Sequence, residues 1–304
     1  MRLRTGLAVL PLVLVPLAAC APEDDDSGTA SDDNTSSAPS ETAASDGSES
    51  AAPDACATDQ LNLLSPGTLT VGTDSPAYPP WFVDNDPSNG KGYESAVTYA
   101  VAEQLGFTAD QVTWVKVPFN TSYKPGDKNF DFDINQISIT PQRAEVVDFS
   151  DGYYSAAQAV IALKDSDLAG ASSIADLADF KLGAQTGTTS LTAIRDTIKP
   201  GEEPSVFEDT NAAKQALLNG QVDGIVADLP TAFYITAAEI EDSVIVGQFQ
   251  PVTGEQEQFG MLFEKGNPLV DCVNQALAAL TADGTLDQLQ QQWLSNEVDV
   301  PVLQ

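Results

Sequence analysis

The side chain best suited to bind a charged ligand is that of Arg143. After residue 20 the chain has only two arginines, Arg143 and Arg195, against a formal net charge of -32. Arg143 lies three residues after Thr140, a good helix N-cap, and Pro141 takes the favoured first helical position. A guanidinium fixed beside the Ser138 and Thr140 hydroxyls could bind a carboxylate. On spacing alone, the alternative is an ion pair with one of the many acidic residues.

Short β-branched runs alternate with helical patterns in the part of the chain that must position this arginine. Residues 93–105 place their apolar side chains on one helical stripe, and 211–218 follow Thr210 as a helix cap. Alternating strands and helices over about 240 residues predict an α/β protein with parallel sheets, in one or two cores. The predicted strands are 68–73, 112–117, 130–137, 181–184 and 222–227.

The N-terminal residues indicate export and anchoring. Arg2 and Arg4 precede an apolar run that is shorter than the roughly 20 residues of a membrane span, so 1–19 is predicted as a signal peptide. Residues 17–20 resemble the bacterial lipobox, which implies cleavage before Cys20 and a lipid on it. The alternative is an exported protein with a chance cysteine. With the lipid, the protein would be extracytoplasmic, on the outer face of the cell membrane.

Composition separates a tether from a body. Residues 20–59 are acidic and polar, without lysine or arginine, so we expect a disordered tether. Residues 61–304 still carry 34 acidic and 11 basic residues, which makes nucleic acid and anionic lipid poor partners. The chain has no histidine, which excludes Ser-His and Cys-His catalysis and most transition-metal sites. It has no phosphate-binding glycine loop either. We expect no metal and no cofactor.

Several ordered motifs together resemble the polar amino-acid-binding family of bacterial extracellular solute-binding proteins, which capture ligands for ABC importers. Residues 139–154 reproduce the family's Ile-Thr-Pro-x-Arg-Ala turn and Val-Asp-Phe-Ser-x-x-Tyr-Tyr crossover. The resemblance covers roughly residues 65 to 297. The other matching segments are 67–74 (opening strand), 78–81 (aromatic loop), 181–190 (second-lobe strand and turn), 217–230 (strand ending in an aspartate) and 284–293 (closing helix).

This resemblance implies a two-lobed periplasmic-binding-protein-like fold with two hinge crossovers, the type II form. Lobe one would comprise 60–155 and 253–304, and lobe two 156–252, with crossovers near 153–157 and 249–255. Ligand would bind between the lobes, at the carboxyl ends of the strands. The implied function is that of a monomeric binding protein, not an enzyme, which delivers a polar L-amino acid to a membrane permease.

The resemblance also assigns site residues. Arg143 and Ser138 would bind the ligand's carboxylate from lobe one. Thr188, Thr189 and Ser190 would bind it from lobe two, where a strand leads into a helix whose N-terminal N–H groups favour an anion. Asp228 would bind the ammonium. Helix capping is the alternative for 188–190 and for Asp228.

The ligand's stem and side chain would meet a second group of residues: Asp74, Tyr78, Trp81, Glu94, Asn135 and Gln136. Tyr78 and Trp81 would form an apolar wall, although aromatic residues in such loops also serve packing. Asp74 and Glu94 could reach a distal positive or amide group. Asn135 and Gln136 replace the small residues usual in the family, which would shrink the pocket and add hydrogen bonds. Strand alternation points only one of them into the cleft, unless the strand end bends.

Two further expectations concern cysteines and competing functions. With Cys20 lipidated, Cys56 and Cys272 remain, and in an oxidising exterior an even pair favours one disulfide over two free thiols. A ligand-sensing surface receptor is one alternative function. A dehydratase-type enzyme on the same scaffold is another, and it would need a general acid, for which Glu94 is the candidate.

Overall fold

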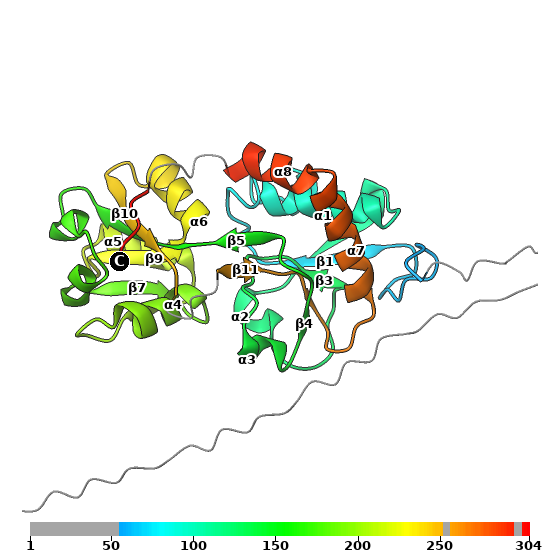
Figure 1. Ribbon diagram of the computed structural model, residues 1–304, viewed down its shortest axis with the longest axis horizontal. Helices are drawn as coiled ribbons and strands as arrows, with labels where there is room; N and C mark the ends of the chain where they lie inside the picture. Colours follow the sequence, from blue (N-terminus) through cyan, green and yellow to red (C-terminus); the bar gives the residue numbers. More distant parts are fainter. Residues whose placement is uncertain (1–54, 252–255, 295–299) are drawn as a thin grey trace, which may run out of the picture. The chain divides into compact units, whose positions relative to one another are not determined.

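The computed structural model describes residues 55–251, 256–294 and 300–304. The predicted signal peptide, Cys20 and almost all of the predicted tether therefore lie outside the described residues. Strands and helices alternate along the described ranges, as predicted for an α/β protein (Figure 1). In the same ranges, no helix combines the length and the apolar character that a membrane span requires.

Two five-stranded sheets form the framework (Figure 1). In the first, of order β2-β1-β3-β12-β4, β1 runs parallel to β2 and β3, and β12 runs antiparallel to β3 and β4. In the second, of order β10-β6-β9-β7-β8, β7 runs parallel to β8 and β9, and β6 runs antiparallel to β9 and β10. The sheets are thus mixed rather than purely parallel. We call the first sheet with its packed helices lobe 1, and the second lobe 2.

The strands are short. Of the strand predicted over 130–137, only Phe132–Asp133 form a β-strand. The strand bounds are Leu69–Thr73 (β1), Val112–Lys116 (β2), Phe132–Asp133 (β3), Asp148–Phe149 (β4), Tyr154–Ala156 (β5), Gln158–Leu163 (β6), Leu182–Gln185 (β7), Ser205–Phe207 (β8), Gly224–Asp228 (β9), Ser243–Phe249 (β10), Glu257–Phe259 (β11) and Leu262–Phe263 (β12).

A two-stranded ribbon links the lobes. β5 and β11 pair antiparallel, with Tyr154 opposite Phe259. β5 falls in the first predicted crossover, and β11 begins just after the second, of which 252–255 lie outside the described residues. Trp81 packs against the ribbon, with ring centroids 5.4 Å from Tyr154 and 5.6 Å from Phe259. The chain therefore crosses between two α/β lobes along paired strands, which is the type II arrangement expected.

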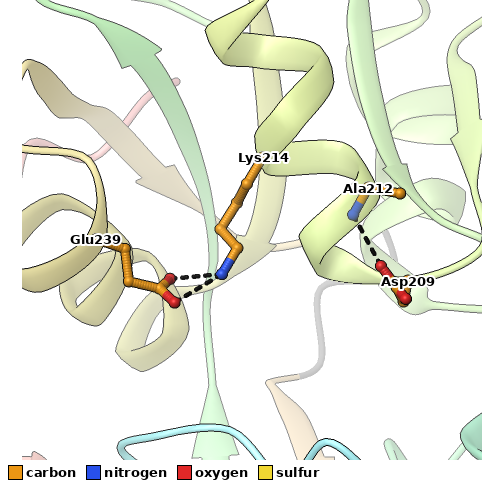
Figure 2. Close-up of polar contacts among 4 residues, drawn as sticks. All are labelled: Asp209, Ala212, Lys214 and Glu239. Atoms are coloured by element: carbon orange, nitrogen blue, oxygen red, sulfur yellow. Dashed lines mark hydrogen bonds and ion pairs between the residues drawn. The ribbon is translucent and has the colours of Figure 1, made fainter.

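The helices lie where the periodicity predicted them, with one corrected cap. α5 begins at Thr210, but its N-cap is Asp209, whose Oδ1 accepts a hydrogen bond from the Ala212 N–H at 2.8 Å (Figure 2). The helix bounds are Tyr93–Gln104 (α1), Phe119–Ser122 (α2), Pro141–Ala144 (α3), Thr189–Ala193 (α4), Thr210–Leu218 (α5), Leu229–Tyr234 (α6), Leu269–Ala282 (α7) and Thr285–Leu294 (α8). Short 3₁₀ turns span Pro87–Asn89, Ala109–Gln111, Asp167–Gly170 and Ala175–Asp179, and π-helical turns at Ile194–Ile198 and Ile235–Glu239 continue α4 and α6.

Each lobe has its own apolar core. In lobe 1, α1, α7 and α8 pack together (Figure 1). The core of this lobe buries side chains such as Tyr93 and Phe132. The predicted disulfide is confirmed: Cys56 is bonded to Cys272 of α7, which joins the start of the described chain to this helix layer.

One expectation fails at the chain end. Leu303 packs in the lobe 2 core, and its N–H donates to the Gln248 carbonyl at 2.8 Å, so the last residues belong to lobe 2 rather than lobe 1.

Candidate functional site

A cavity of about 80 Å³ opens between residues of the two lobes, at the carboxyl ends of β1, β3, β7 and β9. Nine of the twelve residues predicted for ligand binding line it: Asp74, Tyr78, Asn135, Gln136, Ser138, Thr188, Thr189, Ser190 and Asp228. The other three, Trp81, Glu94 and Arg143, are not in its wall. Apolar and hydroxyl side chains such as Phe119, Ile225 and Thr210 complete the lining.

Arg143 lies directly behind the cavity wall and joins the lobes. Thr140 caps α3 as predicted, and its hydroxyl accepts from the Arg143 N–H at 3.2 Å, which fixes where the side chain starts. The guanidinium donates to the Ser138 carbonyl at 2.7 Å and to the Gly187 carbonyl at 2.9 Å. Burial lowers the pKa of Arg143, while the charges of neighbouring groups act against that shift. No carboxylate forms an ion pair with it among the described residues.

The two hydroxyls predicted to bind a carboxylate do meet across the lobes. Ser138 Oγ and Thr189 Oγ1 lie 3.2 Å apart. Both donate to the carboxylate of Glu257, a residue of the crossover strand β11 that the sequence motifs did not indicate. The other carboxylate oxygen of Glu257 accepts from Gln158 Nε2 at 2.8 Å. A carboxylate is therefore held at this point by donors from both lobes.

Asp228 ends β9 and faces the cavity from lobe 2. It occupies the N-cap position of α6, but its side chain makes no capping bond. Instead, its Oδ1 accepts from Gln158 Nε2 at 2.8 Å, and Gln158 Oε1 accepts from Ser190 Oγ at 2.6 Å. Burial, followed by the nearby charge of Glu257, raises the pKa of Asp228 well above its usual range. A ligand ammonium beside these acids would therefore favour the ionised form of Asp228.

Thr188 is chiefly a helix cap. Its hydroxyl oxygen accepts from the Leu191 N–H at 3.1 Å and donates to the Gln185 carbonyl at 2.8 Å. The Thr188 hydroxyl therefore serves as a helix cap, the alternative to ligand binding, although Thr188 still lines the cavity.

Asn135 and Gln136 both line the cavity, but their hydrogen bonds differ. Gln136 adopts a left-handed backbone conformation, with φ of 48°, which bends the strand end. Its backbone N–H donates to Glu94 Oε1 at 2.6 Å, and its side-chain amide also bonds to Glu94. Asn135 is buried, lines the cavity, and its Nδ2 has no hydrogen-bond partner within the described part of the chain. Asn135 thus presents a donor that a ligand could use.

Glu94 lies inside lobe 1 rather than at the cavity. It is fully buried and accepts from the Tyr153 hydroxyl as well as from Gln136. Burial raises the pKa of Glu94 to about 7, although these hydrogen bonds act in the opposite direction. In this structure Glu94 therefore bonds within lobe 1 and is not in the cavity wall, and its contact with a ligand stays a prediction.

The two aromatic residues of the predicted apolar wall, Tyr78 and Trp81, differ in position: only Tyr78 lines the cavity. Tyr78 lines the cavity, and Lys214 Nζ lies 5.6 Å from its ring centroid. Figure 2 shows this Lys214 ammonium on α5 bonded to both carboxylate oxygens of Glu239, each at 2.7 Å. Trp81 is fully buried and donates from Nε1 to Thr231 Oγ1 of lobe 2 at 2.9 Å. Trp81 therefore packs between lobe 1 and the ribbon, as the packing alternative had it.

Asp74 lines the cavity at the tip of β1 with its carboxylate partly occupied. Its oxygens accept from the Ser75 N–H at 2.6 Å and from the Phe119 N–H at 3.1 Å. These bonds orient the carboxylate and leave further lone pairs for a ligand donor. Within the described ranges, no group of cysteine and acidic side chains is placed to hold a metal ion.

Comparison with known proteins decides the family. Residues 69–296 match the family model of bacterial extracellular solute-binding proteins, family 3. The chain belongs to this family. The matched range includes residues of both lobes and of both crossovers, and the expected two-lobed fold is confirmed.

Individual relatives of this family are similar over most of the chain. The L-cystine-binding protein TcyJ of Escherichia coli (strain K12) is 27% identical over 236 residues, which cover 76% of this chain and 84% of that protein. A solved ancestral arginine-binding protein bound to glutamine is 30% identical with a TM-score of 0.64, covering 76% of this chain and 99% of that one. AncCDT-1, described as an ancestral amino acid-binding protein and a precursor of cyclohexadienyl dehydratase, is 33% identical with a TM-score of 0.62, covering 75% and 95%.

Sequence reasoning missed Glu257 and Gln158, whose side chains bond to the predicted site residues Ser138, Thr189 and Ser190. Gln158 carried one signal, because a polar amide opens an otherwise apolar strand directly after the crossover. Glu257 carried none, since only the pairing of β11 with β5 brings it to Ser138 and Thr189.

Proposed function

We propose that this protein captures a polar L-amino acid between its lobes and delivers it to the permease of an ABC importer. The observation that carries the proposal is the meeting of Ser138 and Thr189, which bond from the two lobes to one carboxylate, beside Arg143, whose guanidinium bonds to the Ser138 and Gly187 carbonyls. A ligand carboxylate at this point would bind to both lobes at once, so ligand would favour the closed state.

The opposite end of an amino acid finds a matching group at the cavity wall. Asp228 is the acid that would bind the ammonium, and a positive charge there would lower its raised pKa. Each charge-assisted bond contributes roughly 1.5 to 3 kcal/mol, so three or four support micromolar affinity after the cost of association. The family's relatives, with bound or named ligands such as L-cystine and glutamine, support this ligand class.

The side chain of the ligand would meet Asn135 and Asp74. Asn135 Nδ2 offers a donor without a partner among the described residues, and Asp74 offers an acceptor. This combination favours a polar side chain over an aliphatic one, because an aliphatic ligand would leave the buried amide unpaired. Arginine, histidine, glutamine and cystine all carry polar atoms that such a pair could bind.

The proposed location is the outer face of the cell membrane, with the protein anchored through a lipid on Cys20. The family description places its members outside the cell, and the lipobox-like residues 17–20 support the anchor. Mass spectrometry of the membrane fraction tests it: a diacylglyceryl group on an N-terminal Cys20 is expected, and an unmodified mature N-terminus would overturn it.

Isothermal titration of the purified full-length protein tests the ligand class. The probes are L-cystine, L-arginine, L-histidine and L-glutamine, with agmatine and histamine as the decarboxylated counterparts of arginine and histidine. Binding of at least one amino acid is expected, together with the loss of binding for its decarboxylated counterpart. Equal affinity for acid and amine would refute the proposed carboxylate site, and release of an altered ligand would instead indicate an enzyme.

A further inference from the structure

We propose that Glu257 sets the ligand affinity of this protein, because its carboxylate competes with the ligand's carboxylate for the same hydroxyl protons. The inference rests on the proposed amino-acid site. Nothing in the motifs predicted for that site included Glu257, which lies on the crossover strand rather than in either binding loop.

The contacts of Glu257 coincide with the predicted carboxylate site. One oxygen accepts from Ser138 of lobe 1 and from Thr189 of lobe 2, and the other accepts from Gln158 at 2.8 Å. The guanidinium of Arg143 bonds to the Ser138 carbonyl at 2.7 Å, and the charge of Glu257 supports the protonated form of that guanidinium. Glu257 therefore takes the donors and the counter-charge that a ligand carboxylate would need.

The hydroxyl donors cannot serve two carboxylates. Serine and threonine hydroxyls each carry a single proton to donate. Ser138 and Thr189 both direct that proton to Glu257 here. A ligand carboxylate on the cavity side would have to turn both hydroxyls away from Glu257, whose charge would then lose two of its three hydrogen bonds. Ligand binding is therefore opposed by the loss of these internal bonds.

Charge crowding adds to this competition. Glu257 and Asp228 accept from the same Gln158 amide nitrogen, each at 2.8 Å, so the two acids lie close together. The charge of Glu257 already contributes to the raised pKa of Asp228. A third carboxylate beside one guanidinium, that of Arg143, increases the repulsion unless Glu257 moves away or is removed.

The contrasting possibility is that Glu257 and Asp228 together bind the ligand's ammonium. The observations favour competition, because Asp228 lines the cavity and Glu257 does not, while both oxygens of Glu257 already accept from neutral donors. The two possibilities predict opposite effects of removing the charge. Competition predicts tighter amino-acid binding, and ammonium binding predicts weaker binding.

The test compares Glu257→Gln and Glu257→Ala with the unaltered full-length protein. Isothermal titration uses L-cystine, L-arginine, L-histidine and L-glutamine at one pH and one salt concentration. Glu241→Gln is the matched control, because Glu241 is exposed and its replacement changes the net charge by the same amount. Both Glu257 variants should bind the preferred amino acid at least fivefold tighter, and the control should bind it unchanged.

Several outcomes separate this inference from the proposed function. Weaker or unchanged binding by both variants, while the unaltered protein binds an amino acid, would overturn the inference alone. A gain for agmatine or histamine as large as that for the amino acid would also overturn it, because competition concerns carboxylates only. Binding by the variants but not by the unaltered protein would support it. If no protein bound any probe, the proposed function would fall and the inference with it.

Discussion

Replacement of Arg143 by methionine tests the centre of the proposed site. Methionine keeps an apolar stem near the Phe119 and Tyr123 rings, whose centroids lie 5.5 Å and 4.8 Å from the guanidinium carbon. It removes the bonds to the Ser138 and Gly187 carbonyls, the second of which crosses between the lobes. A hydrogen bond from a charged donor contributes roughly 1.5 to 3 kcal/mol. Loss of the cross-lobe bond and of the ligand's cationic partner should weaken amino-acid binding by at least about 2 kcal/mol, or roughly thirtyfold.

Isothermal titration of the variant checks this magnitude, and Arg195→Met provides the control. Arg195 is half-exposed, and its pair with Glu203 is 3.7 Å long, so its loss should leave affinity and stability nearly unchanged. The Arg143 variant must first show cooperative thermal unfolding, since its guanidinium is buried. A folded Arg143 variant that binds its amino acid within threefold of the unaltered protein would show that this guanidinium neither closes the lobes nor binds the ligand.

Two further predictions concern stability. Both oxygens of the buried Asp133 have no hydrogen-bond partner among the described residues, and burial, then the charges of Glu94 and Asp74, raise its pKa. Below about pH 4 Asp133 is protonated in the folded and the unfolded state; as pH rises from there toward the raised folded-state pKa, ionisation favours the unfolded state and stability is lost. Asp133→Asn should therefore raise the unfolding temperature at pH 8 but not at pH 4, and equal shifts at both would contradict this. Cys272→Ser should lower the free energy of unfolding by about 2 to 4 kcal/mol in denaturant titrations, and adding Cys56→Ser should cost nothing more, because both changes break one disulfide.

Local sequence rules predicted well which helices and strands carry the site side chains. Thr140 and Pro141 identified the short helix that carries Arg143, and the parity of the cysteines identified the disulfide. These features depend on neighbours in sequence or on simple counting. The cap of α5 was misassigned by one residue, because Asp209 and Thr210 are both good caps and only the backbone decides between them.

The contacts that these side chains make could not be predicted, because their partners lie in segments distant in sequence. Arg143 reaches Gly187, 44 residues away, through a packing of lobes that no local pattern encodes. Glu94 was correctly placed at a helix start, but it bonds to Gln136, whose left-handed backbone conformation is uncommon for residues other than glycine. Glu257 reaches Ser138 only because β11 pairs with β5.

The contacts between the lobes explain why ligand chemistry can control closure. Among the described residues each apolar cluster lies within one lobe, so no hydrophobic core has to form or break when the lobes separate. The contacts that cross between the lobes include polar ones: the Trp81–Thr231 and Arg143–Gly187 hydrogen bonds, the bonds of Ser138 and Thr189 to Glu257, and the Lys214 ammonium near the Tyr78 ring. The Trp81–Thr231 bond joins neutral groups and contributes about 1 kcal/mol, and the bonds of the Arg143 guanidinium and the Glu257 carboxylate contribute roughly 1.5 to 3 kcal/mol each, so no single cross-lobe bond contributes more than a few kcal/mol to closure. A ligand carboxylate that replaces Glu257 therefore acts on an equilibrium that a few kcal/mol can reverse.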